Sequence, residues 1–178
     1  VIFPRADHNG AFASDNSVKS FEELHEQIKE KYDLKVYEVK NLPNLVNALN
    51  DARHRYGKIS FAIIGGHGEP EEIALGTNEA NEKSEKVLKK SDLNRKGTSA
   101  LNLAFIDKPT IILDSCSTGT LGGIGQEISK LGATVIAPPK PVTPRSFGAT
   151  VDSEGKIHFN VEYMEEEKES INPNTYVG

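Results

Sequence analysis

The strongest pattern in the chain is a series of short apolar runs separated by amphipathic stretches. Residues 1–3, 59–64, 110–113 and 133–137 are almost wholly apolar, and residues 34–39 alternate. Apolar runs of this length are typical of strands that are buried on both faces of a parallel sheet. The pattern therefore predicts five strands.

Between these runs, apolar residues recur at helical spacing. The spacing predicts four helices, which begin near residues 17–20, 45, 91 and 121 and end near residues 32, 56, 105 and 131. Strands that alternate with helices predict a parallel sheet with right-handed crossovers and helices on both faces. We expect an α/β fold in three α/β/α layers with a mostly parallel central sheet.

The last part of the chain has a different pattern. Residues 148–163 are expected to form a C-terminal hairpin whose turn is residues 152–155. Residues 78–90 are mostly polar and are interpreted as a solvated loop or lid. Residues 1–178 are expected to form a single domain, in which residues 165–178 are a charged peripheral tail.

Composition narrows the function classes. The chain has 178 residues, a net charge of -5 and a pI near 5.6, which disfavours nucleic acid or an anionic membrane as the main partner. No apolar run is long enough for a membrane span, and no signal-peptide pattern is present, so cytoplasmic and secreted locations both stay open. One cysteine excludes an internal disulfide and a cysteine-rich zinc site. We expect no metal and no cofactor, and the oligomeric state stays open.

The single cysteine lies at the end of an apolar run. Residues 114–119 read Asp-Ser-Cys-Ser-Thr-Gly, with Cys116 third. His67 follows another apolar run, within Gly-Gly-His-Gly. Ligands bind outside the carboxyl ends of parallel strands, so both side chains are candidates for chemistry. A helix directly after Cys116 would favour its thiolate. The alternatives are a buried structural thiol and a loop histidine that is bonded to the backbone.

Other catalytic motifs do not fit. The chain has no phosphate-binding Gly-x-x-x-x-Gly-Lys-Ser/Thr segment and no Gly-x-Ser-x-Gly nucleophile elbow. A phosphatase loop would place arginine six residues after Cys116, where Gly122 stands.

The two motifs together resemble the caspase-like cysteine peptidases, which include caspases, metacaspases, legumains, clostripain and gingipain relatives. The 49 residues from His67 to Cys116 are close to the ~50 noted for caspases. The nearest match is to the metacaspase and clostripain-like families. Metacaspases carry Asp-x-Cys-x-Ser-Gly, and this chain has Thr118 in place of that serine and Ser117 where they usually carry histidine. The resemblance follows the element order of residues 1–137 and implies a caspase-like fold.

The resemblance implies a cysteine endopeptidase with a Cys-His dyad. Cys116 would attack the scissile carbonyl and form an acyl-enzyme, and His67 would protonate the leaving amine. The N–H groups of Gly68 and Cys116 would form the oxyanion hole. Water would then hydrolyse the acyl-enzyme. Calcium dependence stays open, since Glu69, Glu71 and Glu72 follow His67 but form no obvious calcium-binding cluster.

Acidic residues near the nucleophile predict the substrate class. Asp114 is two positions before Cys116 on a strand, so both side chains leave the same face. A carboxylate there suits arginine or lysine at P1, the substrate residue before the cleaved bond. Metacaspases and clostripain-like enzymes use an aspartate in this way, and Asp7 is a second acidic candidate. Lys140 and Arg145 would instead favour an acidic P1. We expect a peptide or protein substrate with a basic P1 residue.

Two other function classes remain open. One is a non-catalytic caspase-like module that binds a peptide. The other is a small-ligand α/β domain in which the helix start at residues 119–125 holds an anion.

Overall fold

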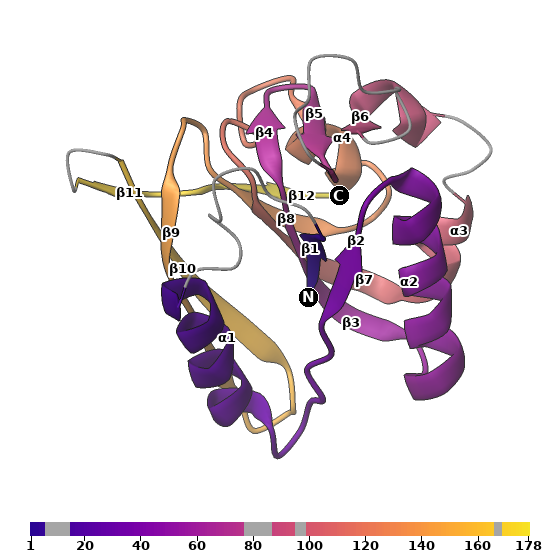
Figure 1. Cartoon of the computed structure of the whole chain (residues 1–178). Coiled ribbons are helices and arrows are strands. Elements are labelled where there is room, and N and C mark those ends of the chain that lie inside the picture. Colours follow the sequence, from indigo (N-terminus) through magenta and orange to yellow (C-terminus); the bar gives the residue numbers. More distant parts are fainter. Residues whose placement is uncertain (6–14, 77–86, 95–98, 166–168) are drawn as a thin grey trace.

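The computed structural model describes residues 1–5, 15–76, 87–94, 99–165 and 169–178 (Figure 1). In chain order the elements are β1 (Ile2–Pro4), α1 (Asp15–Ile28), β2 (Tyr37–Val39), α2 (Leu42–Tyr56), β3 (Ile59–Gly65), β4 (His67–Glu69), β5 (Glu72–Ala74), β6 (Val87–Lys89), the 3-10 helix η2 (Lys90–Asn94), α3 (Ser99–Ala104), β7 (Phe105–Asp114), α4 (Ile124–Ser129), β8 (Thr134–Ala137), β9 (Thr143–Val151), β10 (Ile157–Met164), β11 (Ser170–Ile171) and β12 (Asn174–Val177).

The centre of the fold is a six-stranded, mostly parallel sheet. Its strand order is β12-β8-β7-β3-β1-β2, and only the edge strand β12 runs antiparallel to its neighbour. This confirms the predicted α/β class with a mostly parallel central sheet, in an arrangement consistent with three layers. The predicted hairpin is also present, as β9 paired antiparallel with β10.

Side chains alternate between two apolar cores on either side of the sheet. Ala62 and Ile64 of β3 face one core, which α2 and α4 cover, whereas Ile63 faces the other. Ile112 of β7 also faces this second core, which includes α1 and the hairpin β9–β10. Alternation with both faces buried explains why these strands read as continuous apolar runs.

The hairpin is fixed to α1 as well as to the sheet (Figure 1). The backbone N–H of Ala149 donates to Gln27 Oε1 at 2.7 Å, and the Phe147 ring stacks on Phe21 with centroids 5.1 Å apart. Tyr163, near the end of β10, is fully buried and donates its hydroxyl to the carbonyl of Leu113 at 2.8 Å. One outer layer is therefore a helix and a hairpin together.

Two helices are shorter than predicted. The helix expected over residues 91–105 is η2 followed by the short α3, because Phe105 pairs with Ile59 as the start of β7. The helix expected from residue 121 begins at Ile124, after a turn that contains several glycines. In both places tertiary pairing or the cost of ordering glycine outweighs the apolar spacing.

The C-terminal segment differs from its expected role. Residues 165–178 were expected to be a peripheral tail, but β12 adds a strand to the central sheet, with Asn174 opposite Ala137. The prediction missed this short strand, which pairs along the edge of β8, because the residues before it are highly charged. Among the described residues, no helix is long and apolar enough to cross a membrane.

The packing of α1 on β9 gives a testable prediction. Phe147→Ala should lower the free energy of unfolding by about 3–5 kcal/mol, because it removes a buried aromatic ring and leaves a cavity. Urea unfolding measures this difference. Leu121→Ala, at a site that is 81% exposed, is the control and should change stability little. Equal effects of the two variants would contradict this account of the core.

Candidate functional site

The two predicted catalytic segments follow neighbouring strands. β3 and β7 pair in parallel, with Gly65 opposite Asp114. The N–H of Gly66 then donates to the carbonyl of Asp114 at 3.2 Å, which extends the pairing by one residue. His67 and Cys116 each lie two residues beyond the paired ends, so the same edge of the sheet carries both.

A direct contact joins the two segments. A Cβ placed on Gly68 would overlap the backbone N and carbonyl of Cys116 and the hydroxyl of Ser115. Only glycine permits this approach, because backbone atoms cannot move aside as the end of a flexible side chain can. The structure therefore brings the His67–Gly68 segment against Cys116. The sequence alone had left this adjacency open.

The Cys116 thiol is half-buried and contacts the segment that precedes β9. Its Sγ lies 3.3 Å from the carbonyl of Val142, to which it donates, and accepts from the Val142 N–H at 3.4 Å. Further bonds hold the same two segments together: Ser117 N–H to Lys140 O at 3.0 Å, and Gly119 N–H to Pro138 O at 2.8 Å. The residues after the cysteine thus run beside the Pro-rich segment.

The expected stabilisation of a thiolate by a following helix is not present. Helix α4 begins at Ile124, eight residues after Cys116, with Gly123 as its N-cap. Residues 115–123 are turns instead of helix. The N–H group of Val142 is the donor that the structure places at the sulfur.

Asp114 is the most unusual titratable group near Cys116. It is 2% exposed, and its Oδ2 has no hydrogen-bond partner within the described residues. Burial raises the pKa of this carboxyl from 3.8 to about 7, because an anion loses its hydration there. Burial and the charge of Asp114 also raise the pKa of Tyr163 well above its ordinary value. The described part of the chain therefore contains a buried carboxyl group whose Oδ2 has no hydrogen-bond partner.

The other charged candidates differ in placement. Asp7 lies outside the described residues, and so does the side chain of Arg145. Lys140 carries an ion pair with Glu165 at 3.0 Å, and its side chain is 61% exposed. Because the charge of Lys140 is already paired with Glu165, which follows β10, Lys140 gives less support to an acidic P1 residue.

The described residues contain no cluster of three or more His, Cys, Asp or Glu side chains that could hold a metal ion. Two of the acidic residues after His67 are paired with lysines of β6 and η2: Glu72 with Lys89 at 3.9 Å, and Glu71 with Lys90 at 3.6 Å. Calcium dependence stays open and is tested by assay.

The glycine-rich segment before α4 uses its N–H groups internally. Gly122 donates to Gln126 Oε1, and the N–H groups of Gly123, Ile124 and Gly125 donate to backbone carbonyls. An anion at residues 119–125 would have to displace these bonds. The small-ligand interpretation therefore loses its main physical support.

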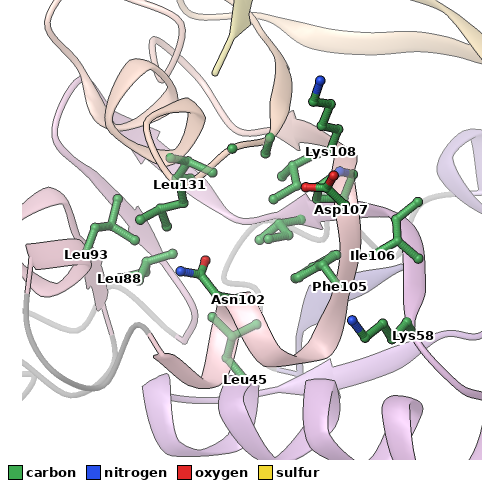
Figure 2. Close-up of a pocket in the computed structure, with 16 residues that line it drawn as sticks. Leu45, Lys58, Leu88, Leu93, Asn102, Phe105, Ile106, Asp107, Lys108 and Leu131 are labelled. Atoms are coloured by element: carbon green, nitrogen blue, oxygen red, sulfur yellow. The ribbon is translucent and has the colours of Figure 1, made fainter.

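One cavity in the described part of the chain lies away from this site. It has a volume of about 350 Å³ and lies on the α2 side of the sheet, where Leu45, Leu88, Leu93 and Phe105 line it (Figure 2). The short α3 and α4 leave this part of the sheet thinly covered. None of the predicted site residues lines the cavity.

Sequence reasoning missed Val142 and Tyr163. Both contact the site from the hairpin region, through the Cys116 thiol and the carbonyl next to Asp114. The alternation of residues 157–164 could have placed Tyr163 on an inward face. No local pattern could have named its partner, because 50 residues separate it from Leu113.

In comparisons with known proteins, no family model, no curated protein and no solved structure matches this chain.

The buried Asp114 predicts how stability depends on pH. Between pH 4 and about 7 the folded protein keeps a proton on Asp114 that the unfolded chain releases, so rising pH favours unfolding. Asp114→Asn should remove this loss of stability with rising pH, because an amide does not ionise. Urea unfolding should find the variant more stable than the parent at pH 8, by a few kcal/mol, and close to it at pH 4. Asp107→Asn, an exposed position on the same strand, is the control. A parallel pH dependence of the parent and Asp114→Asn would contradict the argument.

The close approach of Gly68 gives a second prediction. Gly68→Ala should destabilise the fold by about 1–3 kcal/mol, because the new methyl group forces two backbone segments apart. Gly148→Ala is a matched control, since a Cβ there meets Asn160 and Gln27 at ordinary contact distances. Thermal unfolding compares the two. A stable Gly68→Ala protein would show that the segments are not in contact.

Proposed function

We propose that the chain is a cysteine endopeptidase that cleaves after arginine or lysine. The observation that carries this proposal is the contact of the His67–Gly68 segment with Cys116 at the ends of two adjacent parallel strands. This contact brings together the backbones of a candidate nucleophile and a candidate proton-transfer residue, as joint action on one substrate carbonyl requires. The resemblance to caspase-like peptidases supports the same assignment.

The chemistry follows from these groups. His67 takes the proton of the Cys116 thiol, and the sulfur attacks the scissile carbonyl carbon. The resulting oxyanion accepts hydrogen bonds from the N–H groups of Cys116 and Gly68. Collapse breaks the C–N bond, and His67 gives its proton to the leaving amine. Water then attacks the thioester, with His67 as the base, and releases the acid and the free thiol.

Loss of the thiol proton would change the hydrogen bonds of Cys116 Sγ. In the structure Sγ exchanges two hydrogen bonds with Val142. Loss of the thiol proton would end the bond to the Val142 carbonyl and strengthen the bond from its N–H, because charged acceptors bind donors more strongly. The two bonds with Val142 thus position the sulfur before substrate binds.

The buried Asp114 supports a basic P1 residue. Its Oδ2 has no hydrogen-bond partner in the described part of the chain, a costly state that a bound guanidinium or ammonium group would compensate. Such a cation also favours ionisation of the carboxyl, so binding and ionisation are coupled. Since burial alone raises the pKa to about 7, the preference for a basic P1 should strengthen as pH rises through neutrality.

The assignment is tested with fluorogenic peptides that differ only in a terminal Arg, Lys or Asp. Cleavage after Arg and Lys is expected, with no turnover by Cys116→Ala. His67→Ala should lower kcat at least 100-fold. Each peptide is assayed with added calcium and with a chelator, which also tests calcium dependence.

The variant Asp114→Asn tests substrate preference separately from the reactivity of the Cys116 thiol. It should lower kcat/KM for the Arg peptide and remove the rise with pH near 7, while the thiol still reacts with a small alkylating reagent. Turnover that survives in Cys116→Ala would overturn the proposal. A preference for Asp would overturn the role of Asp114.

Labelling by an arginine chloromethyl ketone gives a second readout, because it needs one chemical event and no turnover. Intact mass should show one adduct on the parent and none on Cys116→Ala. A peptide-binding module without catalytic power would bind the Arg peptide and show neither cleavage nor label.

A further inference from the structure

The residue after the candidate nucleophile has a strained backbone. Ser117 has a φ of 60°, in the left-handed region that residues with a side chain rarely adopt. Such a conformation persists only where surrounding contacts hold it. The contacts that hold this turn therefore decide where the backbone of Cys116 points.

Gly119 is the most firmly held residue of the turn. Its N–H donates to Pro138 O at 2.8 Å, and a Cβ on it would overlap the carbonyl of Ala137. Its carbonyl accepts two further bonds, from Asn174 Nδ2 and from the Tyr176 hydroxyl, each at 2.8 Å. Gly119 is thus fixed by hydrogen bonds to its N–H and its carbonyl. The lack of a side chain lets the carbonyl of Ala137 approach it closely.

Both side-chain donors come from β12. Asn174 and Tyr176 are two residues apart, so they share one face of the strand, and Thr175 faces the other way. β12 pairs with β8, with Asn174 opposite Ala137, and this pairing fixes both donors relative to the turn. Tyr176 also packs against the apolar core, which limits the movement of its ring.

We propose that Asn174 and Tyr176 are positioning residues for Cys116, an inference that rests on the proposed peptidase function. Their bonds to Gly119 hold the turn of residues 116–119, keep Ser117 in its left-handed conformation and keep the turn beside the segment that ends at Val142. The N–H of Cys116 and the bond from Val142 to Sγ both depend on this alignment. β12 is then part of the machinery of the site as well as an edge strand.

The test uses Tyr176→Phe, Asn174→Leu and the double variant. Tyr176→Phe removes one oxygen and keeps the ring in the core, so it should fold. Thr175→Val, on the opposite face of the same strand, is the matched control. The rate of Cys116 alkylation by iodoacetamide is measured against pH, which requires no peptidase activity. Thermal unfolding shows that each variant is folded.

Loss of the two bonds should loosen the turn and weaken the donor at Sγ. In the double variant we expect the rate of Cys116 alkylation at neutral pH to fall roughly tenfold. With the Arg peptide, kcat should fall by a similar factor while KM changes little. Thr175→Val should match the parent in every measurement.

A rescue experiment tests the role of strain. Glycine adopts a left-handed φ without cost, so Ser117→Gly in the double variant should restore part of the alkylation rate. An unchanged alkylation profile in the folded double variant would overturn the proposal, and so would an equal effect of Thr175→Val or a failure of the rescue. A parent protein that cleaves no peptide would sink the peptidase assignment, and the alkylation profiles would still decide the role of β12.

Discussion

The parallel pairing of β3 with β7 is the contact on which the candidate site depends. Its register places Gly65 opposite Asp114, and the bond from Gly66 to Asp114 continues it. Because parallel strands end at the same edge, the residues that follow them must share that edge. A shift of the pairing by one residue would move each side chain of the strand to the opposite face of the sheet. Every side chain would then pack in the wrong core, so the two apolar cores fix the register. The contact of Gly68 with Cys116 follows from this register.

The hairpin β9–β10 gives the site its second wall. It fills the core on the side of α1, and its two ends reach both halves of the site: Val142 precedes β9 and contacts the thiol, whereas Tyr163 near the end of β10 bonds the carbonyl next to Asp114. The candidate nucleophile Cys116 and the peptide group before Asp114 are therefore both bonded to one supersecondary unit. The hydrogen bond from Ala149 to Gln27 also attaches that unit to α1.

Unfavourable features gather within four residues. Within the described residues, the buried Asp114 Oδ2 and the Ser115 hydroxyl have no hydrogen-bond partner, and Ser117 has a left-handed backbone. Each of these features lowers the stability of the fold, and none is needed for a loop that only connects two elements. Such clustering is typical of sites where binding or chemistry requires groups to be held in place before the ligand arrives. The hydrogen bonds at Gly119 offset part of this cost.

Periodicity alone determined the class of fold, because runs such as residues 59–64 and 110–113 can be buried only between two layers. It also placed His67 and Cys116 at strand ends. The helix expected directly after Cys116 was wrong, since glycines and the bond from Ile124 to Pro70 delay α4. Only the tertiary structure decided which strands are neighbours, which backbone contacts the thiol and how deeply Asp114 is buried. Pairing between distant strands and loss of hydration depend on what the rest of the chain brings near a residue, and local sequence does not encode that.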